Sequence, residues 1–292
     1  MTNRQRRLTG VLSAGLVTVL AASGSVALPS ANASPPAVPA ASTATVVEIP
    51  VYFHLVTNEG VGHWERADVE RVVEQLNEGF AKGFPAPPPG TWGSDWGPRD
   101  GTSAPAPFRF VLEDVDWTED TNWYNEHKYK PDDIEGRSLL AKVRKGGLNA
   151  MNVISPTGPG TYGTSSAFAP EWAVSDPQKD MIWLNPASFT ATPYSTLAST
   201  IVHEAGHWLG LNHTFEGGCD DSGDDGVEDT PKHLVDSAPS FLDPAPDSCP
   251  DKPGKDPLWN FMSYGSYARV FTQGQVDRMI DQYQRYRAPS RN

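Results

Sequence analysis

Three histidines and one glutamate lie within a single segment, residues 203–213, whose sequence is HEAGHWLGLNH. On a helix, the four-residue spacing of His203 and His207 places both imidazoles on one face, one turn apart. A helix that continued would carry His213 about 9 Å further along the axis and about 240° around it. Gly210 permits the left-handed backbone that ends a helix. We therefore expect a turn at Gly210 to return His213 to the other two histidines.

Three neutral imidazoles that leave one open position form a typical catalytic zinc site. Glu204 follows the first histidine and lies about 100° around the helix from it. Zn²⁺ at such a site lowers the pKa of a water molecule toward 7, and a nearby carboxylate serves as general base. The pattern predicts that Glu204 takes the proton as the water attacks a carbonyl carbon. Histidines on an ordinary helix surface are the alternative, but they do not account for the glycine that ends the helix.

The elements that must position this segment follow from hydrophobic periodicity. A helix is predicted from about Ser195 to Gly210, and a second, amphipathic helix over 67–83. Runs rich in β-branched and aromatic residues, or alternating in polarity, predict strands over 46–56 and 108–115, one ending near Ile154, and one over 181–184. Residues 118–136 are polar and predict a loop. The last helix begins at Thr272, where the sequence TQGQ predicts a capping box.

Charge and the first residues indicate the compartment. The chain has 23 basic and 36 acidic residues, a net charge of −13, which argues against nucleic acid or an anionic membrane as its main partner. Residues 1–33 have three arginines, no acid, an apolar stretch and small residues at 31–33. This pattern predicts a signal peptide, with a membrane anchor as the alternative. We expect a linker at 34–45, one domain at 46–292, a secreted extracellular product and no membrane span after cleavage.

The chain contains two cysteines, Cys219 and Cys249, which excludes an all-cysteine zinc site. In an oxidising exterior two thiols pair and persist. We expect one disulfide, with two unpaired buried thiols as the alternative.

The 203–213 segment resembles the metzincin zinc metalloproteases, and Asn260-Phe-Met-Ser-Tyr264 resembles their Met-turn. Segments 213–219, 226–231, 249–250 and 271–275, with Arg278-Met279, resemble the pappalysin (cytophagalysin-like) family. The resemblance implies an α+β fold with a twisted mixed sheet and an active-site helix above a cleft. A smaller irregular lower subdomain, about 211–292, would hold the Met-turn and the C-terminal helix, and the upper subdomain would span about 46–210.

The resemblance also implies roles for individual residues. His203, His207 and His213 would be zinc ligands, Glu204 the base, Met262 an apolar floor, and Tyr264 a hydroxyl that stabilises the tetrahedral intermediate. An antiparallel edge strand near Ser165–Ala169, including Ala167 and Phe168, would bind extended peptide. Two features depart from the family. Many members have an acidic residue where this chain has Ser263, and they have further cysteines where this chain has a single pair.

Weaker predictions concern other side chains. The acidic loop has Asp224, Asp225 and Asp229 as candidate Ca²⁺ ligands, Asp229 by family resemblance, and a solvated acidic turn is the alternative. Asp281, like Asp277, either faces a pocket for a basic substrate side chain or is a surface helix charge. His54 is expected in the core or the cleft, and His233 in a surface loop.

The sequence therefore predicts a secreted zinc-dependent endopeptidase acting on proteins or extended peptides, with Zn²⁺ and possible Ca²⁺ as cofactors. Two alternatives are a zinc amidase acting on small non-peptide amides and a non-catalytic binding protein on the same fold. No oligomeric state is predicted.

Overall fold

The computed structural model describes residues 45–59, 64–86, 89, 103–121, 124, 141–156, 166–167, 169–184, 196–221, 223–235, 246–264 and 268–289. All of them belong to one compact unit, Thr43–Asn292. The predicted signal peptide and all but the last residue of the predicted linker lie outside the described residues.

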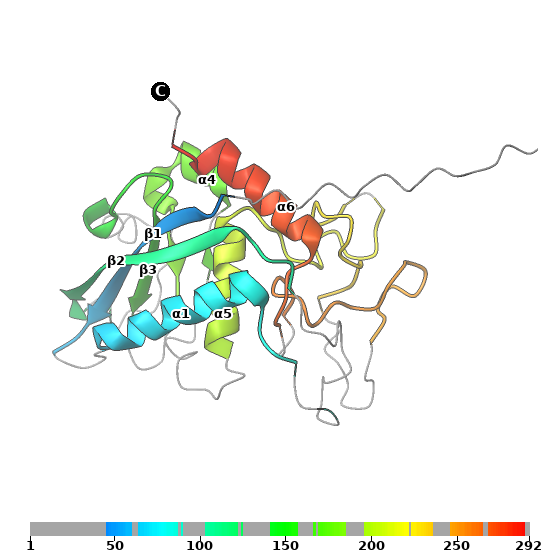
Figure 1. The fold of residues 1–292 in the computed structure, drawn as a ribbon, viewed down its shortest axis with the longest axis horizontal. Helices are drawn as coiled ribbons and strands as arrows, with labels where there is room; N and C mark the ends of the chain where they lie inside the picture. Colours follow the sequence, from blue (N-terminus) through cyan, green and yellow to red (C-terminus); the bar gives the residue numbers. More distant parts are fainter. Residues whose placement is uncertain are drawn as a thin grey trace, which may run out of the picture. The chain divides into compact units, whose positions relative to one another are not determined.

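A five-stranded sheet has the order β2-β1-β3-β5-β4. Its strands are β1 (Val47–Thr57), β2 (Phe108–Glu119), β3 (Met151–Pro156), β4 (Ser166–Ala167) and β5 (Ile182–Trp183). All neighbouring pairs are parallel except β4 and β5, which are antiparallel. The predicted mixed sheet with an antiparallel edge strand is therefore confirmed for the described residues. Figure 1 shows its strands β1, β2 and β3 side by side.

Strand β2 is longer than its sequence pattern predicts. The predicted loop begins at Thr118, but Thr118 and Glu119 pair with Val56 and Thr57 of β1. Thr57 also donates its hydroxyl to the Glu119 carboxylate at 2.9 Å. Pairing with a neighbouring strand thus extends β2 past Thr118, a residue type that strands favour, to the polar Glu119.

Helices α1 (Arg66–Lys82) and α5 (Thr196–Trp208) contact each other and lie against the sheet (Figure 1). The buried face of α1 includes Leu76 and Phe80, both fully inaccessible. Burying such a side chain contributes about 1.5 to 3 kcal/mol. Gly79 lets the two helices approach, because a Cβ atom there would lie 2.5 Å from Val202 Cγ2 of α5. This contact fixes α5 against α1.

The short helices α4 (Pro170–Ser175) and η1 (Pro177–Lys179) precede β5, and α6 (Gln273–Gln282) continues into η3 (Tyr283–Arg287). The predicted capping box is confirmed. The main-chain N–H of Gln275 donates to Thr272 Oγ1 at 3.2 Å, and the main-chain N–H of Thr272 donates to Gln275 Oε1 at 3.0 Å. Arg287 pairs with buried Asp180 and donates to the Trp208 carbonyl at 2.8 Å. The end of the last helix is thereby attached to the end of α5.

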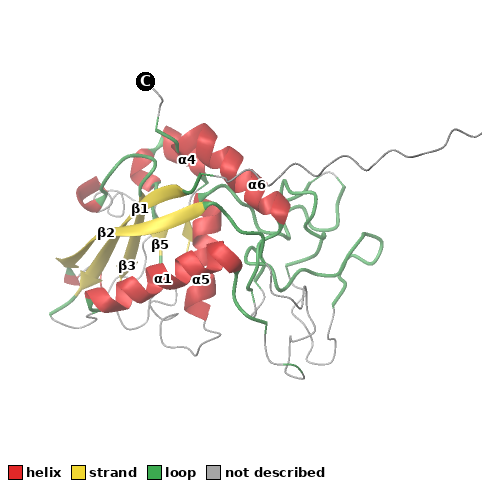
Figure 2. Cartoon of the chain, in the orientation of Figure 1, coloured by secondary structure: helices red, strands yellow, loops and turns green. Residues whose placement is uncertain are grey.

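The described residues between Leu211 and Phe271 form turns and loops, with one isolated bridge between Asn260 and Val270 (Figure 2). This matches the irregular lower part that the family resemblance implies. One hydrophobic core joins both parts, since Phe261, Met262 and Met279 belong to the same cluster as the sheet residues.

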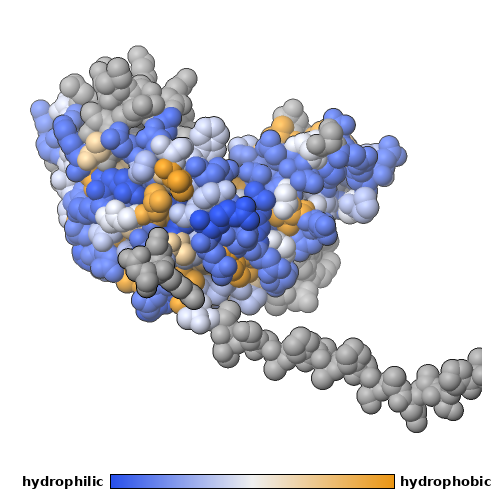
Figure 3. Space-filling model, turned by 90° about the horizontal axis from the view of Figure 1, so that it is seen from above, coloured by the Kyte–Doolittle hydropathy of each residue, from blue (hydrophilic) through white to orange (hydrophobic). Residues whose placement is uncertain are grey.

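His54 lies in the core, as predicted, with 1% of its surface exposed. Its ring nitrogens hydrogen-bond to Asp116 of β2 and Asn152 of β3. Hydrophilic residues predominate on the face in Figure 3, where hydrophobic residues form small patches. In the part of the chain that the structure describes, no helix is both long and apolar enough to cross a membrane.

Candidate active site

Helix α5 has one apolar face, which packs in the core, and a second face, which carries His203 and His207. Ile201, Val202, Ala205 and Trp208 are completely buried in the core. That burial fixes the rotation of the helix about its axis and aims His203 and His207 away from the sheet-facing side. The predicted helix, which ends at Gly210, is confirmed within two residues.

The helix ends in a Schellman motif. The Gly210 amide donates to the His207 carbonyl at 2.9 Å, and the Leu211 amide to the Gly206 carbonyl at 2.9 Å. Gly210 has φ +95°, a conformation that L side chains rarely adopt. The predicted turn at this glycine is therefore confirmed.

The turn brings His213 back to the helix. The Nε2 atom of His207 lies 3.1 Å from Nε2 of His203 and 3.1 Å from Nε2 of His213. In the described residues, these three side chains form the one group of at least three His, Cys, Asp or Glu whose candidate ligand atoms lie within 4.8 Å of one another. Tetrahedral Zn²⁺ with nitrogen ligands at 2.0–2.1 Å separates those nitrogens by about 3.3 Å. The spacing fits such an ion.

The tautomers of two histidines are fixed by main-chain carbonyls. His203 Nδ1 donates to the Phe261 carbonyl at 2.6 Å, and His207 Nδ1 donates to the Leu211 carbonyl at 2.7 Å. Each neutral ring then has its proton on Nδ1 and a lone pair on Nε2. Lone pairs that face one another repel unless a cation lies between them, so the donor set fits a metal ion.

Burial keeps the three imidazoles neutral. It lowers the pKa of His203 to about 3 and that of His213 to about 4, and the repulsion between a protonated ring at either position and a protonated His207 adds to both shifts. Burial also lowers the pKa of His207. Neutral imidazole is the form that binds metal.

Glu204 is 4% exposed, and its Oε2 atom has no hydrogen-bond partner among the described residues. Burial raises the pKa of this carboxyl to about 8. A buried carboxyl atom without a partner, one residue from a histidine of the three-histidine group, is suited to meet a water molecule or a substrate.

Two aromatic side chains, Phe215 and Tyr264, contact the ring of His213. Phe215 stacks on its ring with centroids 4.6 Å apart and planes at 13°. Tyr264 contacts the rings of His213 and Phe215, each at 4.8 Å between centroids, while 64% of its own surface is exposed. Burial, and then the charge of Glu204, raises the pKa of the Tyr264 hydroxyl. The phenol therefore stays protonated and able to donate a hydrogen bond.

Met262 is fully buried and lies against α5 at Gly206. A Cβ atom on Gly206 would come within 2.5 Å of Met262 Sδ, so a larger residue at this position would displace the Met262 side chain. Met262 thus lies directly under the helical turn that joins the two histidines of α5.

Comparisons with known proteins find metalloproteases of similar sequence. The family model Peptidase_M43, described as "Pregnancy-associated plasma protein-A", matches residues 151–284. An "Extracellular metalloprotease NCU07200" of Neurospora crassa is 30% identical over 256 residues, which cover 83% of this chain and 76% of the relative. An "Extracellular metalloprotease" of Pyricularia oryzae is 29% identical over 256 residues, which cover 85% of this chain and 79% of the relative.

This chain belongs to the pappalysin family of metalloendopeptidases.

Among solved structures, mature mirolysin of Tannerella forsythia in complex with a cleaved peptide matches this pappalysin chain with a TM-score of 0.61. It is 21% identical, and the match covers 82% of this chain and 92% of mirolysin. At that identity the likeness concerns the fold, which is a metzincin fold. The fold predicted from the resemblance is therefore confirmed.

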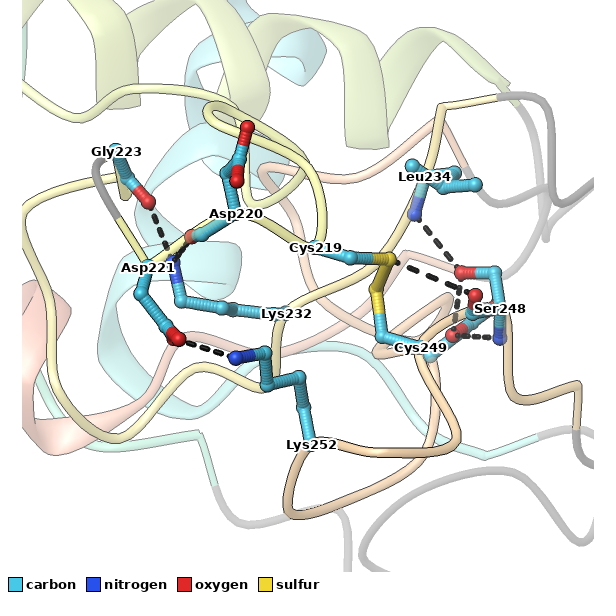
Figure 4. Close-up of a disulfide and its surroundings, with 10 residues drawn as sticks. Cys219, Asp220, Asp221, Gly223, Lys232, Leu234, Ser248, Cys249 and Lys252 are labelled. Atoms are coloured by element: carbon cyan, nitrogen blue, oxygen red, sulfur yellow. Dashed lines mark hydrogen bonds and ion pairs between the residues drawn. A yellow bond between two sulfur atoms is a disulfide. The ribbon is translucent and has the colours of Figure 1, made fainter. Parts of the chain in front are cut away.

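The predicted disulfide between Cys219 and Cys249 is present in this pappalysin, with a sequence separation of 30 residues (Figure 4). It joins the acidic loop to the loop that precedes the Met-turn. Ser248, next to Cys249, accepts a hydrogen bond from the Leu234 amide and donates to Asp256. The disulfide therefore belongs to a network that holds three loop segments together.

The three aspartates expected to bind Ca²⁺ have separate partners. Asp224 accepts from the Gly226 amide, Asp225 from the Val227 amide and the Thr230 hydroxyl, and Asp229 from the Gly274 amide of α6. They line a cleft of about 450 Å³ together with Lys232 and Lys252. Calcium binding stays a prediction.

Lysines supply positive charge within this acidic loop. Lys232 Nζ donates to the carbonyls of Asp220 and Gly223, and Lys252 pairs with Asp221 (Figure 4). Sequence reasoning did not identify these two lysines, because their partners are main-chain carbonyls or distant acids.

The residues expected to contact substrate are placed as follows. Ala167 is in the edge strand β4, paired with Ile182, whereas Phe168 lies outside the described residues. Asp281 is exposed on α6 and pairs with Arg285, and Asp277 accepts from Gln273. These contacts favour the alternative prediction, in which both aspartates are charges on the surface of the helix.

The prediction for His233 is wrong. It is 1% exposed, its Nε2 lies 2.8 Å from Thr214 Oγ1, and Phe215 contacts its ring edge-on. The sequence around His233 has no helical or strand periodicity that would predict burial, because a loop and not a periodic element positions this residue.

Proposed function

We propose that His203, His207 and His213 bind Zn²⁺ and that Glu204 is the general base of a secreted endopeptidase. The observation that carries this proposal is the convergence of three Nε2 atoms beside a buried carboxyl that has a partnerless oxygen. Zn²⁺ in such a site supplies Lewis-acid activation of a water molecule and of the scissile carbonyl group.

The protein's own groups carry the protons and the charge. Glu204 accepts the proton that the water loses as its oxygen adds to the carbonyl carbon, and delivers it to the departing amine nitrogen. The C–N bond then breaks to leave a carboxylate and an amine. The Tyr264 hydroxyl donates a hydrogen bond to the former carbonyl oxygen, which becomes negatively charged in the tetrahedral intermediate.

An extended peptide would add to the edge strand β4. In the strand order of the described residues β4 stands at the end of the sheet, next to β5, which is the position where a further strand would add. Main-chain hydrogen bonds of this kind bind substrate with little dependence on its side chains. We therefore assign Ala167 and Phe168 to the substrate-binding strand.

The test replaces Glu204 and follows two quantities. Casein hydrolysis should be abolished in Glu204→Ala while the zinc content per chain stays at one. Glu216→Ala, which removes an exposed glutamate near the site, should retain both hydrolysis and zinc. Hydrolysis that persists in Glu204→Ala disproves the base assignment, and zinc that survives His203→Ala disproves the ligand set.

Substrate length distinguishes a peptidase from an amidase. An endopeptidase that uses β4 should cleave peptides extended on both sides of the scissile bond much faster than single-residue amides. Equal turnover of the two would favour the amidase alternative.

Export is proposed from the composition of residues 1–33 and from relatives named extracellular metalloproteases. Expression in a secreting host should give culture-medium protein whose N-terminal residue is close to Ser34. Full-length protein that stays in the cell would contradict the signal peptide.

A further inference from the structure

Two buried amide side chains pair with each other where the Met-turn meets α6. Asn260 and Gln275 are both 0% exposed. Asn260 Nδ2 donates to Gln275 Oε1 at 2.8 Å, and Gln275 Nε2 donates to Asn260 Oδ1 at 2.9 Å. A fully satisfied pair of this kind holds one relative geometry, because any displacement leaves buried polar groups without partners.

The pair connects the first turn of α6 to the Met-turn. On the helix side, Gln275 Oε1 also accepts from the Thr272 amide at 3.0 Å. On the other side, Asn260 Oδ1 also accepts from the Met262 amide at 2.8 Å. The direction of the Met262 N–H bond is therefore set by Asn260, and the position of Asn260 by Gln275.

That N–H group shares a peptide unit with the Phe261 carbonyl. A peptide unit is planar, and in the trans form its C=O and N–H bonds point in opposite directions. Fixing the Met262 N–H toward Asn260 therefore fixes the Phe261 C=O on the opposite side. The Phe261 oxygen accepts a hydrogen bond from His203 Nδ1 at 2.6 Å. The corresponding bond from His207 Nδ1 to the Leu211 carbonyl measures 2.7 Å.

We propose that Gln275 is a positioning residue for His203, acting through Asn260 and the Phe261–Met262 peptide unit. This inference rests on the proposed function, in which His203 is a metal ligand. The hydrogen bond to the Nδ1 atom sets the tautomer and the ring orientation of a histidine ligand, and loss of such support typically costs 10- to 100-fold in metal affinity. Gln275 thus links the start of the last helix to the geometry of a ligand on α5.

A purely structural role for Gln275 makes a different prediction. Gln275 is also part of the capping box of α6, so its loss would weaken that helix whether or not His203 moves. Thr272→Ala separates the two effects, because it removes the hydroxyl that caps the helix but leaves the Thr272 amide and the Asn260–Gln275 pair in place.

The experiment measures Zn²⁺ affinity by competition with a chromogenic chelator, together with the visible spectrum of the Co²⁺-substituted protein and the melting temperature. Gln275→Met should bind Zn²⁺ about 10-fold more weakly and alter the Co²⁺ bands. Thr272→Ala should melt at a lower temperature with unchanged Zn²⁺ affinity and spectrum. Gln273→Ala, an exposed residue of the same turn, should leave all three unchanged.

A second variant covers the case in which Gln275→Met does not fold. Gln275→Glu keeps an acceptor for Thr272 but has no donor for Asn260 Oδ1, so Zn²⁺ affinity should again fall. Wild-type affinity in both Gln275 variants, or in whichever one folds, overturns the positioning role. Wild-type protein that binds Zn²⁺ no better than His203→Ala instead overturns the proposed function.

Discussion

The Nδ1–H of His207 donates to the main-chain carbonyl of Leu211 at 2.7 Å, across the turn that ends α5. The turn therefore does more than return His213 to the helix. The same left-handed glycine that reverses the chain also presents the carbonyl that sets the tautomer of His207. Two of the three imidazoles depend on the conformation of Gly210.

Gly210→Ala should weaken both folding and metal binding. Alanine at φ +95° is strained by about 1 to 2 kcal/mol, and its Cβ atom would lie 2.6 Å from Gln282 Cγ. Relief of that strain moves Leu211 and His213, so Zn²⁺ affinity should fall about 10-fold or more. Urea unfolding and chelator competition measure the two effects.

Gly254→Ala is the matched control for this variant. Gly254 has φ +94° and a neighbouring proline, Pro231, at 2.8 Å from the position of a Cβ atom, but it is not part of the histidine turn. It should lose similar stability while retaining Zn²⁺ affinity. Equal loss of affinity in both variants would mean that Gly210 acts only through general stability.

Tyr264→Phe should reduce the rate of the chemical step without loss of metal. Phenylalanine preserves the ring contacts with His213 and Phe215 but removes the hydroxyl. Removing one donor to a developing oxyanion typically costs about 100- to 1000-fold in kcat. We expect a fall of that order, with KM and zinc content little changed. Tyr286→Phe on η3 should behave as wild type, and a Tyr264→Phe enzyme with wild-type kcat would exclude the hydroxyl from catalysis.

The local part of the site was predictable from the sequence. His203 and His207 lie within one helical turn, and a single glycine determines the return of His213, so spacing and backbone preference are sufficient. The mixed sheet and its antiparallel edge followed from the family resemblance.

The residues that support the site were not predictable in the same way. Phe215 stacks on His213, His233 contacts Phe215 edge-on, and Gln275 pairs with Asn260. These contacts arise inside loops or between segments with no periodic pattern, where nothing in the sequence fixes which side chains meet. Strand β2 was underestimated for a related reason, since its polar end is stabilised by pairing with β1.

Loss of the disulfide should destabilise the protein. A bridge that closes a loop of 30 residues contributes roughly 3 to 4 kcal/mol by restricting the unfolded chain. Cys219→Ser with Cys249→Ser should lower the free energy of unfolding by about that amount, as measured by urea denaturation. Wild-type protein treated with a non-chelating reductant should show the same loss, and unchanged stability in both samples would contradict the prediction.

Acid should destabilise the folded protein by protonating the carboxylate of Asp116. Burial opposes its ionisation, but hydrogen bonds with His54 and Lys145 outweigh burial and lower its pKa below the usual 3.8. Asp114 on the same strand also contacts Lys145. A carboxyl with a lowered pKa in the folded state stabilises the protein above its unfolded pKa, and this stabilisation is lost as the pH falls through the folded value.

The free energy of unfolding of the wild type should therefore fall steeply below about pH 4. In Asp116→Asn this fall should be shallower, because the variant starts less stable at neutral pH and has one carboxyl fewer to protonate. Glu113→Gln, which changes an exposed carboxyl of the same strand, should retain the wild-type slope. Urea denaturation at several values between pH 2 and 6 measures the slopes. Identical slopes for the wild type and Asp116→Asn would show that the contacts of Asp116 with His54 and Lys145 contribute nothing to stability.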